Sequence, residues 1–160
     1  VRAWGHDYDP AGLERVSRGL VEAIGDQVAV FKPQSAFFEC FGSAGIAVLA
    51  RVLDDISQAG ALSILDVKRG DIGSTMTAYA HAYLSGSTDL TADAITVSPF
   101  LGVGALQPAI DLAHATGRGV YLLCRTSNPE GDQVQLVSPG GVERIEVLAV
   151  RYHAPGQENR

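Results

Sequence analysis

The residues best suited to chemistry lie in the middle of the chain, in the segment Asp66-Val67-Lys68-Arg69-Gly70-Asp71. The apolar run before this segment predicts a buried strand, whose successive side chains point to opposite faces. Asp66 and Lys68 therefore share one face, roughly 6–7 Å apart along the backbone. Asp71 follows Gly70 in an expected loop, so that two carboxylates bracket one ammonium. Buried charges are costly unless paired, and the cluster is either a structural ion pair or a functional site.

Composition limits the classes of protein to which the chain can belong. Its 160 residues are 46% hydrophobic and 19% charged, which is typical of a globular domain. The net charge of −6 and the lack of a long basic run argue against binding to nucleic acid or anionic membranes. No apolar run approaches the roughly 20 residues of a membrane span, and no leader segment is expected. Cys40 and Cys124 lack metal-type spacing and are expected to be free thiols in a reducing cytoplasm.

The apolar pattern predicts a repeated strand–helix unit. A first helix is expected to begin at Asp9-Pro10 and to end at Gly25. Ser43 is the expected cap of the second helix, and a third helix has Met76 on an apolar face that is typical of a core or a subunit contact. Strands that are apolar throughout predict a parallel sheet covered on both faces. The predicted strands are 28–31, 62–68, 94–97 and 120–124.

The polar residues of interest all follow the carboxyl ends of these strands. They are Lys32, Asp66, Lys68, Asp71, Ser98 and Ser127. Active sites lie at that end in a (β/α)8 barrel and also in a doubly wound sheet. No GxGxxG or Walker-type loop is present, so neither a dinucleotide site nor a P-loop is expected.

The number of strands predicts only part of a barrel. A complete (β/α)8 TIM barrel takes about 250 residues. We therefore expect an α/β fold with about four parallel strands and intervening helices, without the first strand and the last three of a barrel. Residues 1–135 are expected to form this partial barrel. Residues 136–160 are expected to form an atypical C-terminal helix or tail, in which 142–148 suggest a helix and 145–150 could also be a strand.

Four segments of the chain resemble one enzyme family. The segment that begins at Asp66 resembles the DxKxxD signature of the orotidine 5′-phosphate decarboxylase superfamily. The segments 32–39 (KPQSAFFE), 71–75 (DIGST) and 126–131 (TSNPEG) extend the likeness in the same order. They resemble the longer bacterial subclass found in mycobacteria and related organisms, over residues 10–135.

The resemblance implies decarboxylation of orotidine 5′-monophosphate to UMP in de novo pyrimidine biosynthesis, in the cytoplasm and without a metal or organic cofactor. It assigns Lys68 as the proton donor to C6 of the pyrimidine. Asp66 and Lys32 would belong to the same charged network, with Lys32 also near the ribose. The carboxylates beside Lys68 would keep its ammonium charged in a partly dry pocket.

The resemblance also implies a homodimer with shared sites. Asp71 and Thr75 would reach into the site of the partner subunit, and Ser127 would contact the edge of the pyrimidine. The first-strand aspartate and the phosphate-binding arginine of the family have no counterpart in this chain.

Three alternatives follow from this pattern. The chain is a catalytic segment that is active only in its complete form, or a truncated remnant that keeps the dimer surface and does no chemistry. The third is a magnesium-dependent sugar-phosphate decarboxylase or synthase of the same superfamily. By family pattern those relatives have a glutamate at the position of Lys32, so Lys32 favours the orotidylate enzyme.

Overall fold

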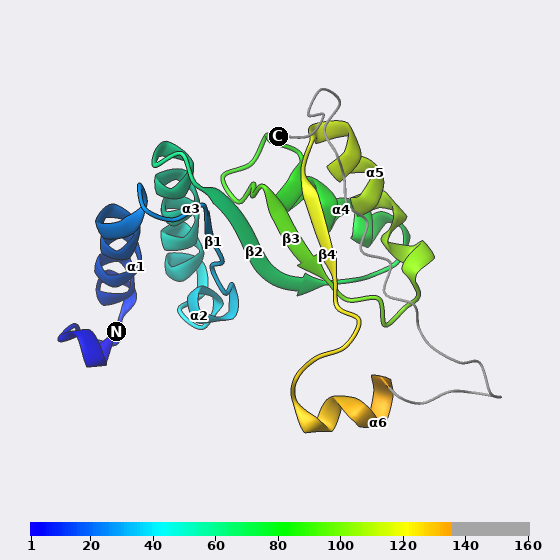
Figure 1. Cartoon of the computed structure of the whole chain (residues 1–160), viewed down its shortest axis with the longest axis horizontal. Helices are drawn as coiled ribbons and strands as arrows, with labels where there is room; N and C mark the ends of the chain where they lie inside the picture. Colours follow the sequence, from blue (N-terminus) through cyan, green and yellow to red (C-terminus); the bar gives the residue numbers. More distant parts are fainter. Residues whose placement is uncertain (136–160) are drawn as a thin grey trace.

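Four parallel strands form the centre of this computed structural model, which describes residues 1–135 (Figure 1). They lie side by side in chain order and all three neighbouring pairs are parallel. The predicted α/β fold with four parallel strands is therefore confirmed. The second and third strands match their predicted ranges closely, whereas the outer two are shorter. The strands are β1 (Val30–Phe31), β2 (Leu62–Arg69), β3 (Ala94–Val97) and β4 (Gly119–Leu122).

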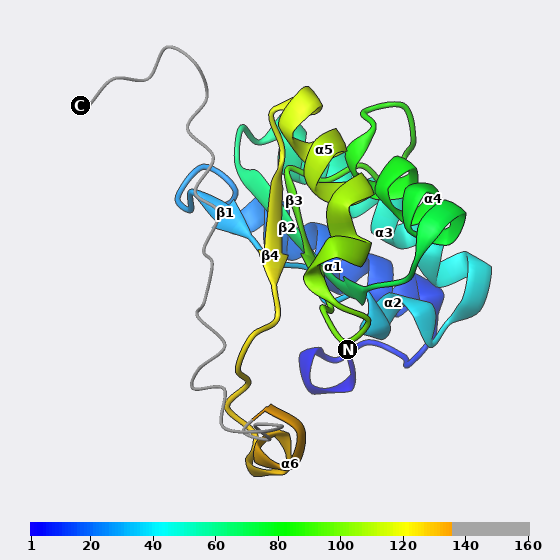
Figure 2. The ribbon, with the colours of Figure 1, turned by 90° about the vertical axis from the view of Figure 1, so that its right-hand side faces the viewer.

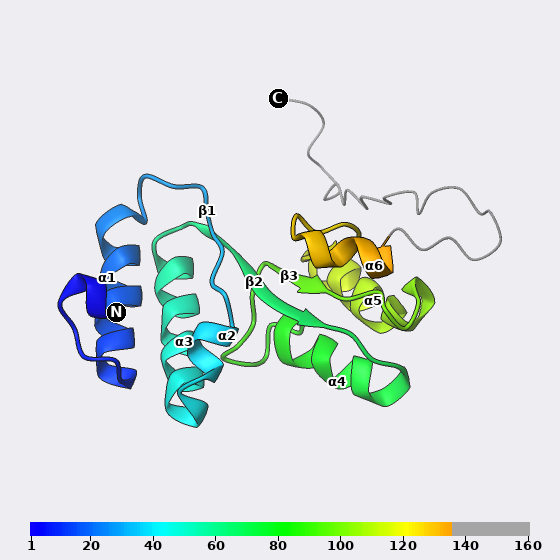
Figure 3. The same cartoon turned by 90° about the horizontal axis from the view of Figure 1, so that it is seen from below.

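Helices cover one side of this sheet. Figure 2 shows α1 to α5 on the same side of the strands, and Figure 3 shows α1 beside α3, with α4 beneath β2 and β3. The four long helices are α1 (Pro10–Ile24), α3 (Gly42–Gln58), α4 (Gly73–Leu84) and α5 (Gln107–Thr116). The shorter elements are α2 (Ala36–Glu39), α6 (Asp132–Gln135) and the 3-10 turns η1 (Arg2–Trp4), η2 (Val103–Leu106) and η3 (Pro129–Gly131).

The hydrophobic core lies between the sheet and these helices. Alternation along β2 turns Leu65 and Val67 toward the helices, and the partner strand adds Ile95 and Val97. Met76 is fully buried in the same core, so the apolar face predicted for its helix is a core face. Burial of such side chains is the main stabilising contribution to a fold of this kind.

The opposite face of the sheet is not covered by any element among residues 1–135. Leu62 and Val30, which pair across β1 and β2, are 57% and 45% exposed, and Tyr121 on β4 is 54% exposed. The expectation of a sheet covered on both faces is therefore correct for only one face of the described structure. Asp66 and Lys68 lie on the same face as Leu62, because residues two apart in a strand share a face.

The first residues of α1 and α3 can be compared with the predicted helix caps. Asp9 caps α1 as predicted, because its Oδ1 accepts a 2.7 Å hydrogen bond from the Gly12 amide. The prediction for Ser43 is wrong: α3 begins at Gly42, and Ser43 makes no capping hydrogen bond. Gly42 has a φ of 62°, which lets the chain turn sharply from α2 into α3 without a polar cap.

Two further points concern the predicted C-terminal element and membrane-spanning helices. The predicted helix or strand within 142–150 lies outside the described residues. Within residues 1–135, none of the helices combines the length and the apolar character needed to cross a membrane.

Candidate active site

Two lysines flank one carboxylate at the carboxyl end of the sheet. Lys32 Nζ lies 2.6 Å from Asp66 Oδ2, and Lys68 Nζ lies 2.6 Å from Asp66 Oδ1. Lys32 and Lys68 are the only two lysines in the sequence. The structure thus brings together three of the predicted site residues, from the end of β1 and from β2. The arrangement is the reverse of the predicted one. Two ammonium groups share one carboxylate, whereas the sequence predicts two carboxylates around one ammonium.

Two neutral residues complete the contacts of Asp66, and the sequence analysis missed both. Gln34 Nε2 donates to Asp66 Oδ2 at 3.1 Å, and Thr96 Oγ1 donates to Asp66 Oδ1 at 2.7 Å. Gln34 reaches this position because the chain after Lys32 runs parallel to β2, with an isolated bridge between Gln34 and Asp66. Thr96 is a polar residue inside the apolar strand β3, which was an available signal for a buried hydrogen-bonding role.

The electrostatics of the site depend on the burial of Asp66. Its side chain is 4% exposed, whereas those of Lys32 and Lys68 are 55% and 46% exposed. Burial raises the pKa of Asp66, but hydrogen bonds from Lys32, Lys68 and Thr96 outweigh burial and lower this pKa to about 2. Asp66 is therefore ionised at neutral pH, and the two ammonium groups extend from it toward the uncovered face of the sheet.

The backbone of Lys68 is strained. Its φ of 46° is the only positive φ at a non-glycine residue within residues 1–135. The register between β2 and β3 shifts between Leu65 and Arg69, as in a β-bulge. The amide of Lys68 donates to Thr96 Oγ1 at 3.0 Å, a side-chain acceptor in place of the usual carbonyl of a strand. Strain of this kind costs on the order of 1–3 kcal/mol and concentrates at functional sites.

Gly70 allows the close approach of two loops beside the site. A Cβ atom on Gly70 would lie 2.3 Å from the backbone oxygen of Ser98. We expect Gly70→Ala to lower the free energy of unfolding by about 1–3 kcal/mol, because the two loops must separate. Chemical denaturation measures this change. Gly104→Ala, where a Cβ meets nothing within 4 Å, is the matched control and is expected to have little effect. Equal stability of the two variants would contradict this interpretation.

Asp71 and Thr75 do not join the cluster within one chain. Asp71 Oδ1 accepts a 2.7 Å hydrogen bond from the Ile72 amide, and within residues 1–135 no ion pair joins Asp71 to Lys68. Thr75 is exposed in the first turn of α4. Within the described residues Lys68 pairs with Asp66 and not with Asp71, so the expected bracketing of Lys68 by two carboxylates is wrong for a single chain.

Ser127 lies in the polar loop that follows β4 and is exposed. The loop is held by its own side chains: Thr126 Oγ1 donates to Asn128 Oδ1 at 2.6 Å, and the Thr126 amide donates to Gln135 Oε1 at 2.8 Å. No hydrogen bond or ion pair within residues 1–135 joins Ser127 to Asp66 or the lysines. Figure 1 shows this loop and α6 beyond the carboxyl ends of the strands, the same end of the sheet as the lysines.

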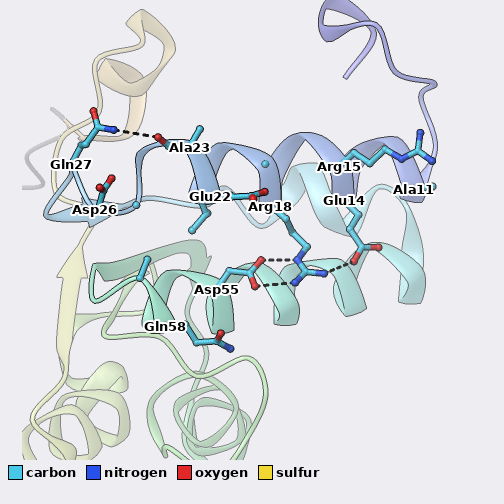
Figure 4. A pocket seen from close by; sticks show the side chains of 14 residues that line it. Ala11, Glu14, Arg15, Arg18, Glu22, Ala23, Asp26, Gln27, Asp55 and Gln58 are labelled. Carbon is cyan, nitrogen blue, oxygen red and sulfur yellow. Dashed lines mark hydrogen bonds and ion pairs between the residues drawn. The ribbon is translucent and has the colours of Figure 1, made fainter.

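A large groove lies elsewhere, between α1 and α3 (Figure 4). Its volume is about 1070 Å³, and its side chains bind one another. Arg18 lies 3.2 Å from Glu14 within α1 and 2.6 Å from Asp55 of α3, and the second of these ion pairs joins the two helices. The groove has no lysine, and we interpret its charged residues as structural. Within residues 1–135, no group of three or more His, Cys, Asp or Glu side chains is arranged to hold a metal ion.

Comparisons with known proteins all point to the same protein family. Residues 13–157 match the model of the orotidine 5′-phosphate decarboxylase / HUMPS family. The chain is 59% identical over 147 residues to an orotidine 5′-phosphate decarboxylase from Salinispora arenicola, covering 92% of this chain and 53% of the relative. It is 58% identical over 132 residues to the enzyme of that name from Streptomyces coelicolor, covering 82% and 48%. The chain spans about half the length of the curated relatives it matches.

Solved structures agree with the sequence comparisons. A crystal structure from Streptomyces avermitilis, provisionally named as the same enzyme, superposes with a TM-score of 0.84 at 57% identity. The match covers 86% of this chain and 48% of that one. The OMP decarboxylase of Leishmania donovani superposes with a TM-score of 0.72 at 36% identity, covering 83% and 50%. The four-stranded fold is therefore part of a barrel, as predicted, and the chain belongs to the orotidine 5′-phosphate decarboxylase / HUMPS family.

Proposed function

We propose that this chain supplies the catalytic lysines of an orotidine 5′-monophosphate decarboxylase, which forms UMP and carbon dioxide in de novo pyrimidine biosynthesis. Residues 1–135 are its partial-barrel segment. One observation supports the proposal above all: Lys32 and Lys68 bind the same buried carboxylate, 2.6 Å from each ammonium, at the carboxyl end of the sheet. The relatives most similar in sequence are named for this activity.

The proposed reaction needs a fixed positive charge beside C6 of the pyrimidine. When the C6–carboxylate bond breaks, carbon dioxide leaves and the electron pair stays on C6, where the ring delocalises it poorly. The Lys68 ammonium stabilises this pair and then gives C6 a proton, which leaves a neutral amine that regains a proton from water. A charge held in place before the reaction costs no reorganisation during it. No metal or organic cofactor takes part in this scheme.

The neighbouring residues have proposed roles that agree with their contacts and exposure. Asp66 is ionised and fixes both lysines, so it sets the distance between the two ammonium groups. Lys32 is half exposed at the strand end and is proposed to contact the ribose. Ser127, in the exposed loop after β4, is proposed to donate to the edge of the pyrimidine when the loop closes over the substrate.

We also propose that the protein is a cytoplasmic homodimer in which Asp71 and Thr75 act in the site of the partner subunit. Two observations support shared sites: the Asp71 carboxylate is directed to its own backbone, and Thr75 is exposed. Large apolar side chains are also exposed near this end of the sheet, which is typical of an interface. They are Phe37, Ile72 and Phe100, with exposures of 69%, 63% and 80%.

Subunit mixing tests the shared sites. Lys68→Ala and Asp71→Ala are each expected to be inactive alone, because every site lacks one group. In a randomly mixed population, half of the dimers contain one of each subunit, and one of their two sites is intact. Mixing is therefore expected to restore about a quarter of the parent activity. Activity that stays at the level of the separate variants would contradict the assignment of Asp71 to the partner's site.

The activity is best tested in two proteins. The first is this chain, and the second is a chimera in which residues 1–135 replace the matching segment of the Streptomyces coelicolor relative. Each is incubated with orotidine 5′-monophosphate labelled with ¹³C in the carboxyl group, and labelled carbon dioxide and UMP are measured. Product from the chimera supports a functional catalytic segment. A folded chimera without product supports an inactive remnant and contradicts the proposal.

A further inference from the structure

One buried hydroxyl contacts both the anchor carboxylate and the backbone of the proposed proton donor. Thr96 is 5% exposed on β3. Its Oγ1 donates to Asp66 Oδ1 at 2.7 Å and accepts from the Lys68 amide at 3.0 Å. A hydroxyl has one hydrogen to donate, so the acceptance from the amide leaves that hydrogen for the carboxylate. The two hydrogen bonds are therefore compatible and fix the orientation of the hydroxyl.

Both contacts of Thr96 constrain the same residue, Lys68. Asp66 Oδ1, which accepts from Thr96, also accepts from Lys68 Nζ at 2.6 Å. Thr96 therefore constrains Lys68 at both ends: through its amide directly, and through its ammonium by way of Asp66. Lys32 binds the other oxygen, Oδ2, and has no contact of this kind.

Thr96 contacts Lys68 at the point where the backbone of the sheet is strained. Lys68 has a φ of 46°, and the register between β2 and β3 shifts around it. A bulge of this kind removes the amide from the regular hydrogen-bond ladder. The Thr96 hydroxyl replaces the missing acceptor, so the strained conformation does not leave a buried amide unpaired.

We propose that Thr96 is a positioning residue, whose hydroxyl holds the strained backbone and the ammonium of Lys68 in the geometry needed at C6. The expected loss of kcat rests on the proposed decarboxylase function. The expected change in the position of Lys68 does not. A displacement of about 1 Å in a catalytic group costs up to about 100-fold in rate. Loss of the hydroxyl is therefore expected to affect the chemical step more than substrate binding.

The sheet offers a matched structural control. Ser63 is 4% exposed at the amino end of β2, and its Oγ contacts Asp93, the residue directly before β3. It donates to Asp93 Oδ2 at 2.9 Å and accepts from the Asp93 amide at 3.0 Å. Ser63→Ala thus removes a buried hydroxyl that likewise donates to a carboxylate and accepts from a backbone amide, but at the other end of β2 from Lys68.

The structural arm of the test uses this chain and needs no activity. Labelling with [¹³Cε]lysine gives two signals, because the sequence has two lysines. Thr96→Val, which keeps the branched shape but not the hydroxyl, is expected to shift the Lys68 signal and to leave that of Lys32 nearly unchanged. Thr96→Ser is expected to keep both signals near their parent positions. Ser63→Ala is expected to shift neither.

The kinetic arm uses the chimera. Thr96→Val is expected to lower kcat by about 10- to 100-fold with KM changed by less than about threefold, whereas Thr96→Ser stays within about threefold of the parent. If the parent chimera forms no UMP, the proposed decarboxylase function fails, while the lysine signals still decide the role of Thr96. The inference is overturned if Thr96→Val leaves the Lys68 signal in place, or if Ser63→Ala shifts it equally. Equal kcat values for Thr96→Val and Thr96→Ser would also overturn it.

Discussion

Replacement of Lys68 by alanine is expected to lower kcat/KM for orotidine 5′-monophosphate by about 10⁴-fold or more. Proton donation by a positioned group contributes typically about 10²- to 10⁴-fold, and a preorganised charge about 10²- to 10³-fold. Lys68 supplies both in the proposed mechanism. The loss of ultraviolet absorbance that accompanies decarboxylation measures the rate in the chimera, and circular dichroism confirms that the fold is retained.

Lys68→Arg separates the two contributions. An arginine keeps a positive charge next to Asp66, but its guanidinium does not release a proton in proteins. We expect Lys68→Arg to remain at least about 100-fold below the parent, because the proton donor is lost. Turnover of Lys68→Ala within tenfold of the parent would contradict the role of Lys68.

Replacement of Asp66 by asparagine is the second large expected effect. The asparagine keeps the shape of the side chain but leaves two ammonium groups around a neutral amide. We expect kcat to fall by about 100-fold or more, because Lys68 loses the carboxylate that fixes it. Steady-state kinetics of the chimera measure this loss, with Gly104→Ala, where an added Cβ meets nothing within 4 Å, as a control. A kcat within about threefold of the parent would show that Asp66 does not fix the catalytic lysine.

The same variant changes how stability depends on pH. The pKa of Asp66 is lowered from 3.8 to about 2, so the ionised form stabilises the fold by roughly 2 kcal/mol above about pH 4. This contribution is lost as the pH falls from about 4 toward 2. Asp66→Asn is therefore expected to have a smaller difference in free energy of unfolding between pH 5 and pH 2. Asp71→Asn serves as the control, because within residues 1–135 the parent carboxylate accepts a hydrogen bond from the Ile72 amide and makes no ion pair. An unchanged acid dependence in Asp66→Asn would contradict the lowered pKa.

Much of the fold could be predicted because it depends on local signals. The apolar runs 62–68 and 94–97 are strands because their alternate side chains pack under α3, α4 and α5. Asp9 and Pro10 begin α1 because an acceptor and a fixed φ favour a helix start. The prediction for Ser43 is wrong because α3 begins one residue earlier, at Gly42, with Phe41 at the cap position and no side-chain cap.

The site was only partly predictable because its geometry depends on contacts between distant segments. Strand alternation places Asp66 and Lys68 on one face, and the structure confirms this pair. The acceptor for the strained amide comes from Thr96, in the next strand, and no spacing within 66–71 indicates it. The register between β2 and β3 also shifts between Leu65 and Arg69, and a regular two-residue period cannot predict this shift.

The most direct test of the central claim restores an ammonium group at position 68. Lys68→Cys in the chimera, alkylated with 2-bromoethylamine, carries a side chain that differs from lysine by one sulfur atom. Treatment of the parent with the same reagent controls for alkylation of Cys40 and Cys124, which are free thiols. We predict negligible decarboxylation before alkylation and a gain of at least about 100-fold after it. No gain in a folded protein that is alkylated at position 68, or full activity before alkylation, would contradict the claim that the ammonium at this position does the chemistry.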